Sequence, residues 1–363
     1  MWFYRCRRAR ILVRDRSANR SRHGQTLMKK RRVIGMSIVA TGFIWFQVAG
    51  RFEAQRIDEQ RETRATTQTR AAKLRVDSDR LMEAVTTLSD PKFEGRAAGT
   101  PGGLAARAWV LDRFKGIGLQ PVSGSYVYPF TFTRMTMSGR VDGEGANVVG
   151  QCLGTDTRAP VFVVSSHYDH LGVRDGKIYP GADDDASGVA VMLAVAEYCQ
   201  KTPFRRTVVF VAFDAEEAGL QGAKAFMIAP PVPKERIALN VNLDMVSRND
   251  KREIFIAGTH PWPHLKAPLD EVAKRAPITV LFGHDKPVAA AGGVDDWTNQ
   301  SDHGPFNAAK IPFVYFGVED HADYHKPTDT ADKINRGFFV DVAETVLDAV
   351  LQLDLATAVA PPK

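Results

Sequence analysis

Four short apolar runs place the strongest constraint on how this chain can fold. They are rich in β-branched and aromatic residues, which is typical of strands covered on both faces of a sheet. The runs span residues 161–165, 207–213, 238–243 and 311–316. The apolar segment 186–200 lies between the first two and suits a buried helix. Because strand, helix and strand alternate, we predict an α/β fold: a single domain with a mostly parallel mixed central sheet and helices on both faces.

Polar segments lie next to these runs, after the strands or at the start of the helix. In chain order they read SSHYDH (165–170), GADDDASG (181–188), FDAEEAGLQG (213–222), NLDMV (242–246) and DYHKPTDT (323–330). Carboxylates at the start of a helix are favoured by its unpaired N–H groups and its dipole. In an open α/β sheet, binding residues gather outside the carboxyl ends of the strands. We therefore expect the five segments to meet at one edge of the sheet.

The residue types in these segments indicate a site for two divalent cations. A pair of such ions about 3.5–4 Å apart shares one bridging carboxylate and takes about two further carboxylate or imidazole ligands per ion. Asp184 can supply the bridge, and Glu216, beside Glu217, can stay off the metals and accept a proton from water. The remaining ligands are His167, Glu217, Asp244 and His325. This pattern predicts a two-metal hydrolase.

The same segments resemble the M28 family of zinc aminopeptidases. The resemblance covers roughly residues 88 to 340, begins with FEGRAAGTPGG at 93–103 and includes all five segments in the family's order. It implies two zinc ions per chain and the fold of the zinc aminopeptidases. The implied ligands are His167 and Asp244 for one ion, Glu217 and His325 for the other, and Asp184 as the bridge; Asp183 and Asp185 are not ligands.

The resemblance also implies a mechanism and weaker assignments. A hydroxide shared by the two zinc ions would attack a peptide carbonyl, with Glu216 as general base, so that the chain would be a metallo-aminopeptidase acting on peptides. Asp169 resembles the aspartate that orients a histidine ligand. Asp302, in SDHGPF at 301–306, matches a segment near the family's pocket. Some relatives place a tyrosine shortly before that segment, whereas this chain has WTNQ at 297–300, so no residue is assigned to oxyanion stabilisation.

Three alternatives to an aminopeptidase stay open. A glutaminyl cyclase-like acyltransferase would use a single zinc ion, so that metal content separates the two. A non-catalytic, peptidase-like binding protein is expected to have lost ligands, and here none is missing. Hydrolysis of another amide, such as an acylated amino acid, would use the same metal chemistry. The residues constrain the reaction more closely than the substrate.

Charge separates the N-terminal region from the rest of the chain. The net charge is +6, but residues 1–32 alone contain twelve Lys or Arg and one Asp, which leaves −5 for residues 33–363. The basic character belongs to a tail, so we expect no nucleic-acid partner for the domain. Residues 33–50 follow the basic cluster without a charge and are just long enough to span a bilayer as a helix.

These features predict a basic cytoplasmic tail (1–32), a transmembrane signal anchor or signal peptide (33–50), a polar stalk (51–75) and a metallopeptidase domain (76–357). Positive charge before an apolar segment places that side in the cytoplasm. The catalytic domain would therefore be exported, either anchored in the inner membrane on the periplasmic or extracellular side, or secreted after cleavage. The oligomeric state is not indicated.

The cysteines, and the histidines that are not candidate ligands, give little further information about function. Cys152 and Cys199 could pair in an oxidising compartment, but two residues are no disulfide framework, and Cys6 lies in the tail. No serine occupies a G-x-S-x-G elbow. We expect the remaining histidines with no comparable context to be surface or loop residues; they are His170, His260, His264, His284 and His321.

Overall fold

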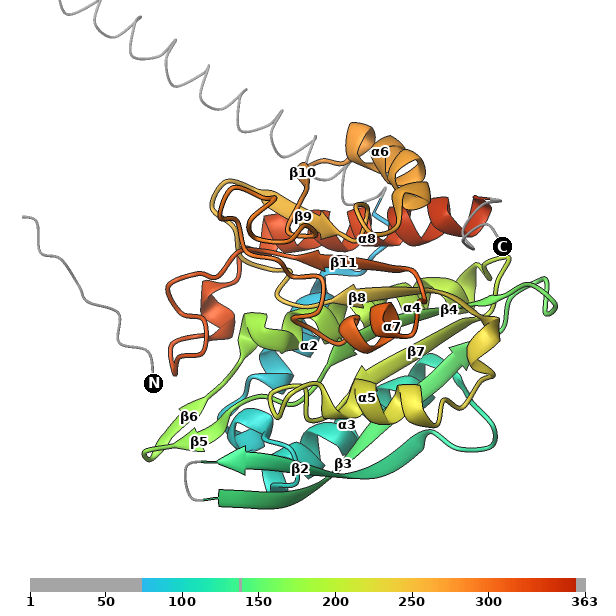
Figure 1. Cartoon of the computed structure of the whole chain (residues 1–363). Helices are drawn as coiled ribbons and strands as arrows, with labels where there is room; N and C mark the ends of the chain where they lie inside the picture. Colours follow the sequence, from blue (N-terminus) through green and yellow to red (C-terminus); the bar gives the residue numbers. More distant parts are fainter. Residues whose placement is uncertain (1–73, 137–138, 357–363) are drawn as a thin grey trace, which may run out of the picture. The chain divides into compact units, whose positions relative to one another are not determined.

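The computed structural model describes residues 74–136 and 139–356, which belong to a single structural unit (Figure 1). The predicted tail, membrane segment and stalk lie outside the described residues, apart from Leu74 and Arg75. Within the described ranges, no helix combines the length and the apolar character that a membrane crossing requires.

Strands and helices alternate along the described chain. The strands are β1 Gln120–Pro121, β2 Val127–Thr136, β3 Gly139–Cys152, β4 Val161–His167, β5 Gly172–Arg174, β6 Lys177–Tyr179, β7 Val208–Phe213, β8 Ile237–Leu243, β9 Glu253–Ala257, β10 Thr279–Phe282 and β11 Phe313–Gly317. The helices are α2 Ser78–Leu88, α3 Pro101–Ile117, α4 Gly188–Lys201, α5 Gln221–Ile228, α6 Lys266–Arg275, α7 Gly304–Ala308 and α8 Arg336–Leu355. Short helical turns are η1 Pro91–Arg96, η2 Ala182–Ser187, η3 Lys234–Arg236, η4 Pro263–Leu265 and η5 Ala331–Lys333.

A nine-stranded mixed sheet forms the centre of the described part. Its order is β1-β3-β7-β4-β8-β11-β9-β10, and β2 pairs with β3. The four strands β7, β4, β8 and β11, which match the four predicted runs, are parallel neighbours. The expected mixed sheet is confirmed, but "mostly parallel" is wrong, because β3 pairs antiparallel with β1, β2 and β7, and β9 pairs antiparallel with β11. β2 and β3 follow each other closely along the chain, and short connections make antiparallel pairs.

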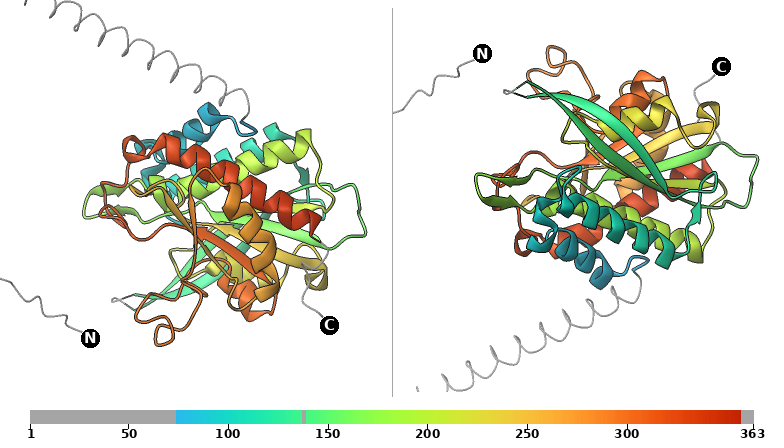
Figure 2. Two further views of the ribbon diagram at one scale, coloured as in Figure 1. Left: turned by 90° about the horizontal axis from the view of Figure 1, so that it is seen from above. Right: turned by 90° about the horizontal axis from the view of Figure 1, so that it is seen from below.

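Helices cover both faces of the sheet, as predicted (Figure 2). Alternate residues of a strand point to opposite faces. Phe162 and Val164 of β4 accordingly join the larger core with residues of α2, α3, α4, α6 and α8. Val161 and Val163 join a second core beneath α5 and α7. Strands buried on both faces are mostly apolar along their whole length, which is why these runs stand out in the sequence.

Local signals define where α3 begins and ends. The Thr100 side chain accepts a hydrogen bond from the Gly103 N–H at 3.2 Å, and Pro101 occupies the first turn, where its missing N–H costs nothing. Gly118 ends the helix in the left-handed region, at φ 91°. The helix therefore starts directly after the FEGRAAGT residues (93–100).

A disulfide joins the antiparallel part of the sheet to α4. Cys152, at the end of β3, pairs with Cys199 of α4, with their Cα atoms 6.3 Å apart. Both residues are buried. The two cysteines are 47 positions apart in the sequence, and the loop that the bond closes contains η2 and most of α4.

We expect the double variant Cys152→Ala/Cys199→Ala to lose about 2–4 kcal/mol in the free energy of unfolding, because the bond restricts the unfolded chain. Urea unfolding of the variant and the wild type measures the difference. The control Cys6→Ala should leave it unchanged. Alkylation of Cys152 and Cys199 in the unreduced, denatured wild type, detected by mass spectrometry, would contradict the pairing.

Candidate metal centre

The predicted ligands meet at the carboxyl edge of the four parallel strands. His167 is the last residue of β4, and Asp244 directly follows β8. Glu217 lies a few residues after β7, and His325 lies in the segment that follows β11. Asp184 belongs to η2, which leads into α4. Parallel neighbours end at the same edge of a sheet, and this brings residues that are far apart in the sequence to one place.

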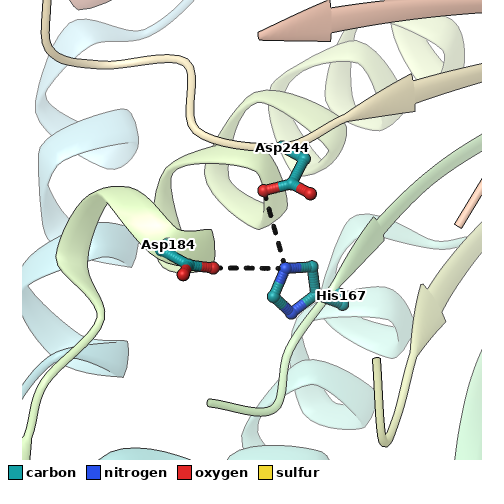
Figure 3. A group of neighbouring side chains, drawn as sticks. All are labelled: His167, Asp184 and Asp244. Carbon is teal, nitrogen blue, oxygen red and sulfur yellow. Dashed lines mark ion pairs between the residues drawn. The ribbon is translucent and has the colours of Figure 1, made fainter. Parts of the chain in front are cut away.

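One group of ligand atoms contains His167, Asp184 and Asp244 (Figure 3). His167 Nε2 lies 3.3 Å from Asp184 Oδ1 and 3.6 Å from Asp244 Oδ1. The three ligand atoms lie within 4.8 Å of one another. The side chains of His167 and Asp184 are almost fully buried. This group has the composition and spacing to hold a divalent cation.

A second group forms on the other oxygen of Asp184. His325 Nε2 lies 3.1 Å from Asp184 Oδ2 and 3.4 Å from Glu217 Oε1. His325 is partly exposed, whereas Asp184 and Glu217 are largely buried. Asp184 therefore directs one oxygen toward each group, which is the position that a bridging carboxylate needs.

His170 also belongs to the second group. Its Nδ1 lies 2.8 Å from Glu217 Oε1 and 3.7 Å from Asp184 Oδ2, and its side chain is fully buried. His170 lies in the loop that follows β4, as predicted, but it is buried and not at the surface. The same holds for His284, which lies in a loop and is buried against Trp297. The available signal for His170 was its position three residues after His167, but spacing alone does not show burial.

Two carboxyl groups at this edge lie in surroundings that disfavour their charged form. Burial raises the pKa of the Asp302 carboxyl well above its usual value, and neighbouring carboxylates add to the effect. Neither carboxylate oxygen of Asp302 has a hydrogen-bond partner among the described residues. Burial likewise raises the pKa of the Glu216 carboxyl, with Asp302 and Asp244 adding to the rise. Concentrated, buried negative charge is what bound cations would compensate, so the donor set fits divalent metal ions.

The pKa values of two imidazoles at the site are also raised, in their case by neighbouring carboxylates. Burial lowers the pKa of His167, but the carboxylates of Asp169, Asp184 and Asp244 outweigh it and raise the pKa well above its usual value. Burial also lowers the pKa of His325, and its carboxylate neighbours raise it to about 10. In the absence of a metal ion, protonated imidazoles thus provide the positive charge between the carboxylates.

Asp185 ties three parts of the site together through hydrogen bonds. Its carboxylate accepts from the N–H groups of His167 at 3.3 Å, Gly188 at 3.0 Å and Met245 at 3.1 Å. These groups belong to the end of β4, the start of α4 and the segment after β8. Asp185 is not directed at the metal groups as a ligand, in keeping with the sequence-based expectation. Its contacts make it a positioning residue for the two segments that carry His167 and Asp244.

Asp169 connects His167 to the Glu216–Glu217 turn. Its carboxylate accepts hydrogen bonds from Glu216 N at 3.0 Å and Glu217 N at 3.4 Å. His167 Nδ1 lies closer to the main-chain oxygen of Asp169, at 3.1 Å, than to its Oδ1, at 3.6 Å. The residue therefore contacts the histidine as expected from sequence, but with its backbone, while its carboxylate holds the adjacent turn.

Arg96, which belongs to the FEGRAAGTPGG motif, is buried and connects several segments around the site. The motif alone did not indicate this role. Its guanidinium donates hydrogen bonds to the main-chain oxygens of Tyr168 at 2.9 Å, Leu88 at 2.8 Å and Gly181 at 2.9 Å. It also donates to the Pro180 oxygen. These bonds connect the end of α2 to the loop after His167 and to the residues that precede Asp184. The cation thus satisfies carbonyl groups that would otherwise be buried without partners.

Two cavities border the centre. A cavity of about 340 Å³ is lined by His167, Asp184, Glu216, Glu217, Asp244 and His325, together with Trp297, Tyr315, Asp320 and Tyr324. A larger cavity, of about 1130 Å³, lies between the start of α3 and the β2–β3 hairpin. Glu217 lines both cavities, and His170 lines the larger one. Of these two cavities in the described part of the chain, the smaller one is lined by Glu216 and by residues of both ligand groups.

Residues 147–350 match the sequence description of Peptidase family M28. The chain belongs to this family. The predicted family resemblance is therefore confirmed, and the match includes every candidate ligand. Aminopeptidase YwaD of Bacillus subtilis (strain 168) is 26% identical over 221 residues, which cover 57% of this chain and 44% of that protein. The chain thus matches less than half the length of this relative.

Solved structures share the fold of this M28 chain. An aminopeptidase from Aneurinibacillus sp. strain AM-1 superposes with a TM-score of 0.62 at 19% identity, covering 77% of this chain and 94% of that one. A glutaminyl cyclase from Bacteroides thetaiotaomicron has a TM-score of 0.61 at 18% identity, covering 76% and 98%. At such identities the likeness extends to the fold alone, and the fold is common to both activities.

His303, next to Asp302, is buried in a neutral state. Its Nε2 lies 2.8 Å from the Trp297 main-chain oxygen, and its ring packs on Phe313 and Tyr315. Burial lowers the pKa of His303 to about 4. The unfolded chain therefore binds this proton at a higher pH than the folded chain.

His303 should make the protein less stable as the pH falls from about 6.5 to about 4, because protonation then favours the unfolded state. Between about pH 8 and pH 5 its contribution should be about 2 kcal/mol. Urea unfolding of the wild type and of His303→Phe at both pH values measures this contribution. It is the change in the free energy of unfolding between the two pH values in the wild type, minus the same change in the variant. Equal pH dependence in the two proteins would rule out a buried, neutral His303.

Proposed function

We propose that this chain is a two-zinc metallopeptidase. The observation that carries the proposal is the position of Asp184, whose Oδ1 lies 3.3 Å from His167 Nε2 and whose Oδ2 lies 3.1 Å from His325 Nε2. Asp244 completes one ligand group and Glu217 the other. Imidazole and carboxylate ligands suit zinc, and membership of Peptidase family M28 supports the same metal.

Glu216 is the proposed general base. When bound, two zinc ions supply Lewis-acid polarisation of a substrate carbonyl and lower the pKa of water. Glu216 lines the same cavity as His167 and Asp244 but belongs to neither ligand group. Its carboxylate accepts a proton from the attacking water and then donates it to the leaving amine.

The proposed substrates are peptides with a free amino terminus. The cavity of about 340 Å³ has room for a terminal residue rather than for a long segment of chain. Trp297, Tyr315 and Tyr324 provide aromatic walls, and Asp320 provides a carboxylate that can attract an ammonium group. The aminopeptidase among the curated relatives and the aminopeptidases of the same fold support this choice.

A glutaminyl cyclase-like reaction is the second candidate, because a glutaminyl cyclase shares the fold. The two ligand groups, one on each oxygen of Asp184, favour the hydrolase, since the cyclase reaction would need one zinc ion.

The location of the protein is a separate proposal. Residues 33–50 are proposed to anchor the chain in the inner membrane or to direct its secretion, because they form an uncharged segment after a basic cluster. The domain would then act outside the cytoplasm.

Glu216→Gln should keep both zinc ions and reduce kcat by about 10²–10⁴, because it removes proton transfer but no metal ligand. The measurement combines zinc content by mass spectrometry with hydrolysis of aminoacyl amides. Near-normal turnover in a zinc-loaded variant would exclude Glu216 as the base.

Asp184→Asn is the comparison for this experiment. It should weaken the binding of both ions, since the same carboxylate faces both groups. If the Asn variant retained two tightly bound zinc ions, Asp184 would not be the bridge.

A further inference from the structure

His170 is a buried histidine whose two ring nitrogens have no hydrogen-bond partner among the described residues. Glu217 Oε1 is equally without one. His170 Nδ1 and Glu217 Oε1 nevertheless lie 2.8 Å apart, so their separation is short but their directions do not make a hydrogen bond. Buried polar atoms rarely lack partners, because an atom that has lost its water and gained no partner destabilises the fold. Two such atoms so close together are suited to bind one and the same cation.

The fold makes room for this imidazole. Gly181 has a left-handed φ of 58°, and a Cβ at this position would lie 2.6 Å from Cγ and Cδ2 of His170. A side chain at position 181 would displace the ring. Gly181 also precedes the η2 turn that carries Asp184, and its main-chain oxygen accepts from Arg96. The packing therefore holds the ring against the second ligand group instead of leaving it free to rotate away.

Two imidazoles lie close to the same pair of carboxylate oxygens, Asp184 Oδ2 and Glu217 Oε1. Asp184 Oδ2, Glu217 Oε1 and His170 Nδ1 form a group that lies within 4.8 Å. His325 Nε2 approaches the two carboxylate oxygens of this group from another direction, and the two imidazole rings lie edge to face with centroids 5.9 Å apart. The other group has three protein ligands. Zinc sites with four protein ligands are typically structural and closed, whereas three ligands leave a position for substrate.

We propose that His170 Nδ1 is a fourth protein ligand of the second zinc ion, at the site of Asp184, Glu217 and His325. This rests on the proposed function, in which two ions are bound. The two sites are then unequal. The second ion is enclosed by protein ligands and held tightly, and the first ion, at His167 and Asp244, keeps the open position that substrate needs.

The test compares full-length wild type, His170→Ser and His170→Cys in zinc competition with a chromogenic chelator. The wild type should show one tight and one weaker site. His170→Ser should weaken the tight site by at least about tenfold, the scale of loss of a supporting metal-site residue, and leave the weaker site unchanged. His260→Ser is the matched control, since His260 lies outside both ligand groups, and it should bind zinc as the wild type does.

His170→Cys separates ligation from a merely structural role. A cysteine Sγ can replace an imidazole Nδ1 because the longer zinc–sulfur bond compensates for the shorter side chain. The Cys variant should recover tight binding that the Ser variant lacks. Loaded with Co²⁺, it should also show a thiolate-to-cobalt charge-transfer band in the near ultraviolet, which neither the wild type nor the Ser variant shows.

The possible outcomes separate this proposal from the proposed function. Two unchanged affinities in His170→Ser and no thiolate band in His170→Cys would overturn the ligand role while leaving a two-zinc enzyme intact. A wild type that binds a single zinc ion would overturn the two-zinc function. In that case, loss of the single ion in His170→Ser would still support ligation by His170, and its retention would overturn it.

Discussion

The crowding of buried carboxylates at the carboxyl edge of the sheet is the constraint on which the candidate site depends. Asp184 lies within a few ångströms of both His167 and His325, with Asp244 beside the first imidazole and Glu217 beside the second. Asp302 is buried near them without a hydrogen-bond partner among the described residues. Burying such charges is costly unless positive charge accompanies them. Protonated histidines can supply part of it, but divalent cations satisfy more oxygens at once. Metal ions bound as proposed would therefore stabilise this arrangement as well as supply chemistry.

Two buried residues that are not candidate ligands keep this edge in place. Asp185 accepts hydrogen bonds from three segments, including the backbone of His167. Arg96 donates to main-chain oxygens on either side of the site, including that of Gly181. Each acts through the backbone, so the ligand side chains remain free to face the metal positions. A rigid support of this kind holds repelling carboxylates at fixed distances, which a flexible loop could not do.

Much of the architecture and the ligand set could be predicted from sequence, because both depend on local patterns. The parallel strands β4, β7, β8 and β11 are continuous apolar runs, and the ligands follow them at short intervals. The roles of Arg96 and His170 could not be predicted, since they depend on contacts with Leu88 and Gly181 that form only when the chain folds. The antiparallel outer strands and the Cys152–Cys199 pairing were undetermined for the same reason. Their partners are chosen by tertiary packing, for which composition and spacing carry no signal.

Zinc content of the purified protein, measured together with hydrolysis of aminoacyl amide and blocked-peptide substrates before and after chelation, tests the central claim most directly. The account predicts about two zinc ions per chain and chelator-sensitive release of free N-terminal residues. One zinc ion with cyclisation of N-terminal glutamine, or a protein that binds no metal, would contradict it.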